Sequence, residues 1–330
     1  MPIDNLDQLI EHLQLAIEIE HVTIPPYLCA LWSIPEGRNV EAAVVIREVV
    51  MQEMLHMTLM ANVMNALGHH PKIAERAVVR DYPTTLPHSD KSFLVDLAPF
   101  SRDTLESFRR IEQPEAICAP PEADDYRTIG QFYAAVADGL TQFASDPSVW
   151  KGDPAWQVLP GTYFYGGGGD AIRVEGLESA QQAIETARCQ GEGMLVDVWE
   201  NSPSREVAHY FAFDELWRGR MYVDGDTYDT GPSGPYLYVD YDCVSPMHPN
   251  PKARDYPVGS SQRELTEVCN RTYTSLLQQL DAAFSGTPSA LIETVPTMKQ
   301  LEYEALALMQ MPYGDGEHVA GPAFEWSDGP

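Results

Sequence analysis

The sequence predicts an all-α fold: a four-helix bundle with long irregular or β-hairpin insertions and additional C-terminal helices. Three observations lead to this prediction. Apolar side chains recur at three- and four-residue spacing over long stretches, which is the period of one helical face. Hydrophobic residues make up 44% of the 330 residues, enough for a sizeable core. Glu and His residues interrupt these apolar rows at positions that would lie at similar heights on neighbouring helices.

The first 70 residues indicate two bundle helices, at about 4–33 and 39–67, joined by a turn at Pro35-Glu36-Gly37. We expect the first helix to kink or break at Pro25-Pro26, because proline lacks an amide donor and clashes with the preceding turn. The apolar row of the first helix consists of Leu6, Leu9, Leu13, Ile17 and Ile24, and it includes Glu20.

Beyond residue 70 the helical pattern becomes discontinuous. Proline, glycine and aromatic residues are frequent there, and the alternating segment 221–244 indicates a β-hairpin or an irregular excursion. All elements are assigned to one domain, residues 1–330. The expected elements are, in order, an insertion (71–176) with one helix (125–143), two bundle helices (177–195 and 204–217), a second insertion (219–260) and two C-terminal helices (262–309).

The composition excludes several classes of function. Acidic residues number 49 against 21 basic ones, so the formal net charge is −28, which disfavours binding to nucleic acid or anionic membranes. No apolar run approaches the roughly 18 residues of a membrane span, and the start does not resemble a signal peptide. The five cysteines are scattered and form no CxxC pair, which is typical of reduced thiols. We therefore expect a cytoplasmic protein, and we leave open whether it forms oligomers.

A Glu-x-x-His pair occurs three times along the chain. On a helix, a three-residue step puts both side chains on one face, about 5–6 Å apart at Cβ, so that they can reach one metal ion. The second and third copies lie in apolar rows, where polar groups must be satisfied. The first copy extends a polar, solvated row and is set aside as a ligand pair. The copies are Glu18/His21, Glu53/His56 and Glu206/His209.

The first two helices are expected to place carboxylates at matching heights. Glu20 lies on the apolar row of the first helix, and the midpoint between Glu20 and Glu53 falls in the turn at Glu36-Gly37. Two antiparallel helices joined by that turn bring Glu20 level with Glu53. This predicts that both carboxylates face one site.

The same midpoint argument applies to the second half of the bundle. The midpoint between Glu192 and Glu206 is Trp199, just before the turn residues Asn201-Ser202-Pro203. A helical hairpin there would bring the two carboxylates level. Glu185 lies on nearly the same helical face as Glu192, so spacing alone leaves both open, and the turn midpoint favours Glu192.

Together these residues form a complete ligand set. One Glu from each of two helices, with a Glu and a His from each of the other two, is the set of ferritin-like di-iron and di-manganese bundles. Four carboxylates balance the charge of two divalent cations and would repel one another without them. Oxygen and nitrogen ligands without thiolate favour two Fe ions, with Mn as the alternative. The predicted metal ligands and catalytic residues are Glu20, Glu53, His56, Glu192, Glu206 and His209.

Several of these motifs resemble the ferritin-like domain family of iminophenyl-pyruvate dimer synthase, which includes proteins of violacein, rebeccamycin and staurosporine biosynthesis. The family often has a second glutamate where Gln52 stands, a position off the inner row. The QGEG match also favours Glu192 over Glu185. The matching segments are 19–28 (IEHVTIPPYL), 52–57 (QEMLHM), 190–193 (QGEG), 206–210 (EVAHY) and 320–325 (AGPAFE).

The resemblance implies a ferritin-like bundle and a role in natural-product biosynthesis, where the named activity is oxidative coupling of two imines derived from an aromatic amino acid. The leading hypothesis is therefore a dinuclear, O₂-dependent oxidase or oxygenase acting on a small, amino-acid-derived substrate, with its pocket formed by the insertion 71–176. One alternative is an iron-binding or ferroxidase-type protein without an organic substrate. Another is a metal-free scaffold with buried hydrogen-bonded carboxylates.

Overall fold

The computed structural model describes residues 3–116, 118–162, 168–191, 198–199 and 206–328. Regular structure in these ranges is helical, and only isolated β-bridges accompany it, as the predicted all-α class requires. The α-helices are α1 (Leu6–Ser33), α2 (Val40–Ala66), α3 (Arg102–Ile111), α4 (Ile129–Phe143), α5 (Leu177–Gly191), α6 (His209–Arg218), α7 (Ser261–Phe284) and α8 (Leu291–Leu308).

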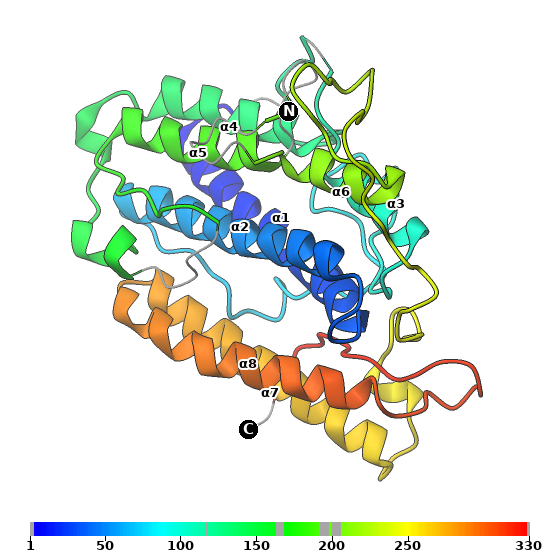
Figure 1. The fold of residues 1–330 in the computed structure, drawn as a ribbon. Coiled ribbons are helices and arrows are strands. Elements are labelled where there is room, and N and C mark those ends of the chain that lie inside the picture. Colours follow the sequence, from blue (N-terminus) through cyan, green and yellow to red (C-terminus); the bar gives the residue numbers. More distant parts are fainter. Residues whose placement is uncertain (1–2, 117, 163–167, 192–197, 200–205, 329–330) are drawn as a thin grey trace.

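The helices form three layers (Figure 1). The long antiparallel pair α1 and α2 lies in the middle. The four shorter helices α3 to α6 cover one face of that pair, and the C-terminal pair α7 and α8 covers the other. Of the described residues, none belongs to a helix long and apolar enough to cross a membrane. The α1/α2 layer is thus buried on both faces, so each helix can present different chemistry to the layers above and below.

α1 and α2 each occupy one of the four helix positions of the bundle. Each of the other two positions is occupied by two short helices placed end to end, α4 with α3 and α5 with α6. α4 packs against α5 and α3 packs against α6, and all four contact the α1/α2 layer. α5 and α6 follow one another along the upper layer in Figure 1. The expected antiparallel hairpin between these two helices is therefore wrong. The argument that this hairpin brings Glu192 level with Glu206 fails with it, because each of the two helices pairs with a helix from the insertion 71–176 instead.

The first helix runs through Pro25 and Pro26 without the break that was one of the two expected outcomes. Proline at position 26 removes the amide that would bond to the carbonyl of Val22 one turn earlier. The hydroxyl of Tyr82 donates to that carbonyl instead, at 2.7 Å, and is itself buried. A side chain from the insertion thus satisfies the group that the proline leaves free, which removes one cause of a kink.

The insertion contributes two helices rather than one. The expected helix at 125–143 appears as α4, which begins after the cap residue Thr128. The unexpected α3 begins at Arg102, after the cap residue Ser101, whose hydroxyl accepts a hydrogen bond from the amide of Thr104 at 3.0 Å. Such a cap satisfies one of the free amides at a helix start. Proline-rich flanks and short length hid this helix in the sequence.

Other element boundaries also shifted. The helix expected at 204–217 begins only at His209, and the helix expected at 177–195 is described to Gly191. The segment 221–244 is an irregular excursion, held by a single antiparallel bridge between Arg220 and Tyr236. The two C-terminal helices lie where predicted, within 262–309, apart from one residue at the start of α7.

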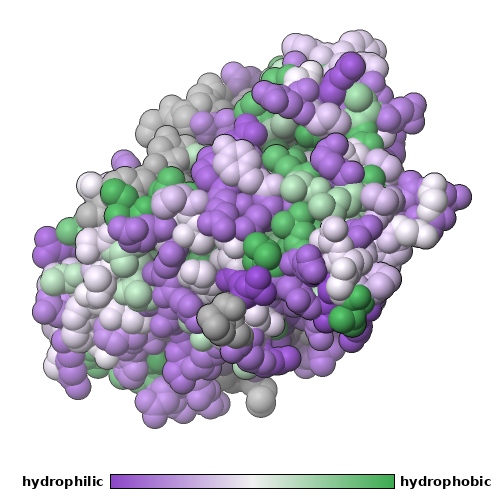
Figure 2. All heavy atoms as spheres, turned by 90° about the horizontal axis from the view of Figure 1, so that it is seen from below, coloured by the Kyte–Doolittle hydropathy of each residue, from purple (hydrophilic) through white to green (hydrophobic). Residues whose placement is uncertain are grey.

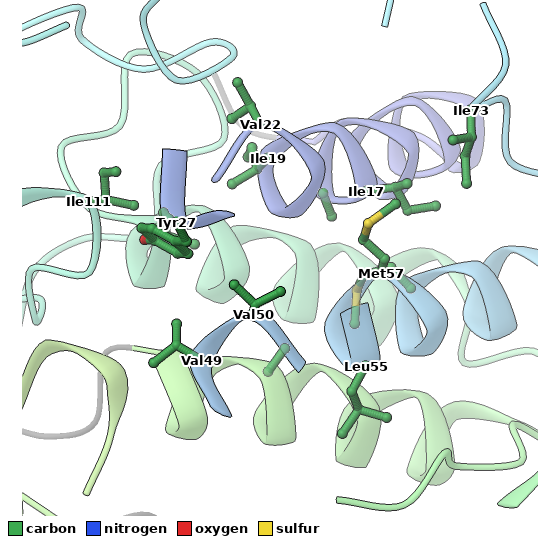
Figure 3. Packing of buried hydrophobic residues seen from close by; sticks show 14 of the residues in the cluster. Ile17, Ile19, Val22, Tyr27, Val49, Val50, Leu55, Met57, Ile73 and Ile111 are labelled. Carbon is green, nitrogen blue, oxygen red and sulfur yellow. The ribbon is translucent and has the colours of Figure 1, made fainter. Parts of the chain in front are cut away.

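The core follows the interfaces between the layers. Side chains from α1 and α2, among them Ile17, Met57 and Val50, lie between the helices with no exposure above 5% (Figure 3). Tyr27 on α1 points toward the side of the upper layer near Ile111. From below, the face made by α7 and α8 is mostly hydrophilic and carries smaller groups of hydrophobic side chains (Figure 2). The buried α1/α2 pair carries three of the side chains of the candidate site described below.

Candidate metal centre

Five buried Glu and His side chains meet between the α1/α2 layer and the upper layer. Glu20 comes from α1, and Glu53 and His56 come from α2. Glu112 directly follows α3, and His209 is the first residue of α6. Each is at most 3% exposed. Ionisable residues are almost never buried to this extent without partners, so the group as a whole requires an explanation.

The five side chains form two overlapping groups that share Glu53. In the first, Nδ1 of His56 lies 3.5 Å from Glu20 Oε2 and 3.9 Å from Glu53 Oε2. In the second, Nδ1 of His209 lies 2.9 Å from Glu53 Oε1 and 3.5 Å from Glu112 Oε2. The two oxygens of Glu53 therefore face different histidines, whose rings are 5.6 Å apart between centroids. This is the layout of two adjacent cation sites joined by a shared carboxylate.

A glutamine holds the far nitrogen of each histidine. Nε2 of His56 lies 3.0 Å from Gln190 Oε1, and Nε2 of His209 lies 2.6 Å from Gln52 Oε1. When Nε2–H donates to a glutamine oxygen, Nδ1 keeps its lone pair and faces the carboxylates, which is the tautomer that binds a metal. Gln52 is 5% exposed and takes part in the site, although its place off the inner row had predicted no role.

Hydroxyl groups orient the three carboxylates. Tyr133 from α4 donates to Glu20, and Tyr27 from α1 donates to Glu112. Thr23 donates to Glu53 Oε2 at 3.3 Å. Burial and the neighbouring carboxylates raise the pKa of both tyrosines well above its usual value, so both stay protonated donors.

The electrostatics of the site are strained without a cation. Burial, together with the charges of Glu20 and Glu112, raises the pKa of Glu53 well above its usual value. For Glu20, burial raises the pKa, but hydrogen bonds with Glu53 and His56 and the charge of His56 outweigh it and lower the pKa to about 2. For His56, burial lowers the pKa, and the hydrogen bond and charge of Glu20 raise it above its usual value. The buried carboxylates thus disfavour one another's charged forms, and a divalent cation would relieve this repulsion.

The donor atoms fit a metal ion. Buried Nδ1 of His209 has no hydrogen-bond partner among the described residues, although Glu53 Oε1 is 2.9 Å away. Ligands about 2.0–2.2 Å from one ion are separated by roughly 3–4.4 Å, and the carboxylate–imidazole separations fall close to that range. The set contains oxygen and nitrogen and no sulfur, which suits iron or manganese.

The structure brings four of the six predicted ligands together: Glu20, Glu53, His56 and His209. Glu206 does not join them, because it is exposed and precedes α6, so the helical step that would align it with His209 is missing. Glu192 lies outside the described residues. The competing Glu185 is exposed and pairs with Arg188.

Glu112 is the site residue that the sequence reasoning missed. It ends a short buried row after Leu105 and Phe108, spaced three and four residues apart. A carboxylate on such a row is the same signal that identified Glu53, but α3 was not recognised as a helix. It supplies the carboxylate expected from the second half of the chain.

A small cavity of about 10 Å³ borders the cluster, enough for roughly one water molecule. α4 and the end of α5 close it. Besides four of the Glu and His residues, its lining consists of Ile129, Gly130, Tyr133, Ala187, Arg188 and Gly191.

Comparison with known proteins agrees with this architecture. The sequence model of the ferritin-like family matches residues 13–218. Dichlorochromopyrrolate synthase from Lentzea aerocolonigenes is 23% identical over an alignment of 401 residues, which covers the whole chain but only 37% of that enzyme. A crystal structure of a ferritin-like protein from Caulobacter vibrioides superposes with a TM-score of 0.68 at 23% identity, covering 99% of this chain and 100% of the other.

Proposed function

The chain belongs to the ferritin-like family, and on that premise we propose that the buried Glu/His cluster is the dinuclear metal centre of an O₂-dependent oxidase or oxygenase. The observation that carries the proposal is the position of Glu53, one carboxylate shared by two Glu/His groups. A scaffold that needed only hydrogen bonds would have no use for three mutually repelling buried carboxylates.

We propose that Glu20, Glu53 and His56 hold one ion and that Glu53, Glu112 and His209 hold the other. Glu192 completes the proposed set as a fourth carboxylate, because the preceding residue, Gly191, lies against Glu112. With these four carboxylates the charge of two divalent ions is balanced. Iron is the proposed metal and manganese the alternative. In the proposed set, Glu112 takes the place of the predicted ligand Glu206, which is exposed.

The bound metal pair would supply the reduction of O₂ that drives oxidation of a substrate. The protein's own groups supply the surroundings. Tyr133 and Tyr27 hold protons next to Glu20 and Glu112 and keep each carboxylate oriented. Gln190 and Gln52 fix the two imidazole rings. Burial of the cluster excludes bulk water, which strengthens each of these interactions.

The proposed substrate is a small, amino-acid-derived molecule, and oxidative coupling of two imines is the reaction we favour. The support is the similarity to dichlorochromopyrrolate synthase, of whose length the chain spans only about 37%. The second candidate is iron oxidation without an organic substrate. The narrowness of the cavity beside the cluster favours it, because about 10 Å³ admits a molecule of the size of water.

Oxygen consumption distinguishes the two candidates. Protein loaded anaerobically with Fe(II) is mixed with O₂, with and without a pre-formed imine of an aromatic 2-oxo acid. An oxidase consumes O₂ over many turnovers only when the imine is present, and a new coupled product accumulates. Consumption that depends on added Fe(II) alone, with the imine unchanged, would establish the ferroxidase function and reject the oxidase.

Removal of the metal is expected to destabilise the protein. A ligand at about a hundredfold above its Kd stabilises the native state by about 2.7 kcal/mol, which corresponds to a Tm shift of roughly 5 °C or somewhat less for a chain of this length. Thermal unfolding with and without a chelator measures the shift, with the Glu53→Ala variant as the control that has no metal to lose. An unchanged Tm for the wild type would favour the metal-free scaffold.

Substitution of Gln52 by Ala is expected to weaken metal binding about 10–100-fold, the usual effect of removing a group that orients a ligating histidine. The loss should affect one ion more than the other, because Gln52 lies against Nε2 of His209. Competitive titration with a chelator measures it. Gln278, exposed on α7, provides the matched control Gln278→Ala. Equal affinities for the two variants would reject a positioning role for Gln52.

A further inference from the structure

Two short helices carry residues of the second proposed ion. α3 and α6 have ten residues each; Glu112 directly follows α3, and His209 is the first residue of α6. Helices of this length are marginal on their own, so packing must set how one lies relative to the other. The two helices pack against each other in the upper layer (Figure 1). The contacts between them therefore decide how far His209 lies from Glu112.

One side chain of α3, that of Arg109, contacts three residues of α6. Nε of Arg109 lies 2.8 Å from Oδ1 of Asp214, and its Nη2 donates to the hydroxyl of Tyr210 at 3.1 Å. The central carbon of its guanidinium group lies 4.4 Å from the centre of the Trp217 ring. Tyr210, Asp214 and Trp217 follow one another at four and three residues, which is the spacing of one helical face. Arg109 therefore contacts one face of α6 along about two turns.

The ion pair between α3 and α6 is buried. Asp214 has no exposed surface, and its Oδ2 lies 2.7 Å from Nε of Arg218 and accepts a hydrogen bond from the hydroxyl of Tyr222 at 2.7 Å. A buried ion pair seldom stabilises a fold more than apolar side chains of similar size would. What it adds is direction, because a planar guanidinium group fits a carboxylate and an aromatic ring in few orientations. The pair therefore points to a role in fixing how α6 lies on α3.

Apolar contacts alone would not fix the position of α6 along α3. Phe108 and Phe213 pack with ring centroids 5.1 Å apart, but hydrophobic attraction is non-directional. A slip of α6 by one residue along its axis would move His209 by about 1.5 Å. Nδ1 of His209 lies 3.5 Å from Oε2 of Glu112, a separation that suits two ligands of one ion. Metal–ligand distances tolerate only about 0.2 Å, so such a slip would break the site.

We propose that Arg109 is a positioning residue for the metal centre: through its contacts with one face of α6 it holds that helix against α3, so that His209 and Glu112 bind the same ion. The inference rests on the proposed function, because it concerns the second proposed ion. The positive charge of Arg109 repels a cation. Any favourable effect of Arg109 on metal binding therefore comes from the position of the helices and not from its charge.

The test is an anaerobic titration of the purified full-length protein with Co(II) in competition with a chelator, which needs no turnover. The wild type should bind about two ions. Arg109→Met should bind one of them about 10–100-fold more weakly, the usual loss when a group that orients a ligand is removed, and the other nearly as the wild type does. Loss of the positive charge alone would act in the opposite direction and tighten both ions. Wild-type or tighter affinity for both ions in Arg109→Met would overturn the proposal.

Two double variants identify which ion is affected. Glu20→Ala should leave only the second ion, so the addition of Arg109→Met should weaken the one ion that remains. Glu112→Ala should leave only the first ion, and the addition of Arg109→Met should not change its affinity. The reverse pattern would place the effect of Arg109 at the wrong ion and overturn the proposal.

Lys252→Met is the matched control for the lost charge. Lys252 is 8% exposed and its Nζ lies 3.1 Å from Oδ1 of Asp81, and neither residue belongs to the metal centre. This variant should bind both ions as the wild type does, even where it lowers the Tm. If Lys252→Met weakened one ion as strongly as Arg109→Met does, the effect would be one of general stability and the positioning role would be overturned.

Asp214→Asn tests the partner of Arg109 and decides the matter if Arg109→Met does not fold. It keeps the size of the side chain but removes the ionic attraction between the helices, so it should weaken the same ion by about three- to tenfold. Added to Arg109→Met, it should cause little further loss, because the pair is already broken. Wild-type affinity for both ions in Asp214→Asn would overturn the role of the pair.

Failure of the proposed function gives a different result from failure of this inference. A wild type that binds no Co(II) would reject the metal centre and the positioning role with it. Two tightly bound ions in both the wild type and Arg109→Met would reject the positioning role alone. Two ions in the wild type, one of them weakened in Arg109→Met, without O₂ consumption by the Fe(II)-loaded protein, would reject the oxidase and uphold the inference.

Discussion

The Glu53→Ala variant should retain no tightly bound metal, whereas we expect about two ions in the wild-type chain. Glu53 is the one carboxylate that faces both histidines, with Oε1 2.9 Å from His209 Nδ1 and Oε2 3.9 Å from His56 Nδ1. Its removal takes an oxygen ligand from each ion. Plasma mass spectrometry of protein purified without added metal, and again after anaerobic Fe(II) loading, measures the content.

The controls for this experiment separate lost ligation from lost structure. Glu11→Ala, an exposed position on α1, should keep the full metal content. Glu20→Ala removes a carboxylate from one group only, so about one ion should remain. The metal-free Glu53→Ala protein should be at least as stable as the metal-free wild type, because Glu53 is repelled by Glu20 and Glu112 there. A variant that keeps two ions and full turnover would reject the shared role of Glu53.

The first half of the bundle could be predicted because its two helices are adjacent in sequence and pack against each other. Two helices of similar length, joined by one short turn, place Glu20 beside Glu53 and His56 by helical geometry alone, and the structure agrees. The turn length leaves no choice of partner for either helix. Patterns of period 3.6 are most reliable in such long, uninterrupted helices.

The second half could not be predicted from the same reasoning. α5 and α6 are near in sequence, and the simplest assumption was that they pair with each other. Each pairs instead with a helix from the insertion, α5 with α4 and α6 with α3. Nothing in the spacing of Glu192 and Glu206 carries this information, because it depends on tertiary packing around the α1/α2 layer. The same packing explains why Tyr82 can compensate for Pro26 in α1.

The hydrogen bonds that glutamines and tyrosines make to the site residues also could not be predicted from local sequence patterns. Gln52 lies off the inner row of α2, yet it reaches His209 because α6 approaches that flank of the helix. Tyr133 reaches Glu20 from α4 across the interface. These partners come from distant positions in the chain, so only the assembled fold brings them together.

The choice between Glu112 and Glu206 provides the second decisive experiment. Glu112→Ala should lose one of about two ions and most of the O₂-dependent turnover, because Glu112 Oε2 lies 3.5 Å from His209 Nδ1 and Tyr27 holds the carboxylate in place. Glu206→Ala should keep both ions, because Glu206 is exposed. Metal analysis and turnover of both variants, prepared in parallel, measure the difference.

The reverse result would identify Glu206 as the ligand in place of Glu112. If Glu206→Ala lost metal and Glu112→Ala kept it, the helix carrying His209 would have to extend back through Glu206 in the metal-bound protein, as the Glu-x-x-His spacing first predicted. Circular dichroism on metal addition would then detect a small gain in total helical content. If Glu112 is the ligand, metal binding needs no such change, because Glu112, Glu53 and His209 already lie within reach of one ion. An unchanged helical content together with a metal-deficient Glu112→Ala variant would therefore establish that the insertion, through α3, supplies a ligand to the bundle.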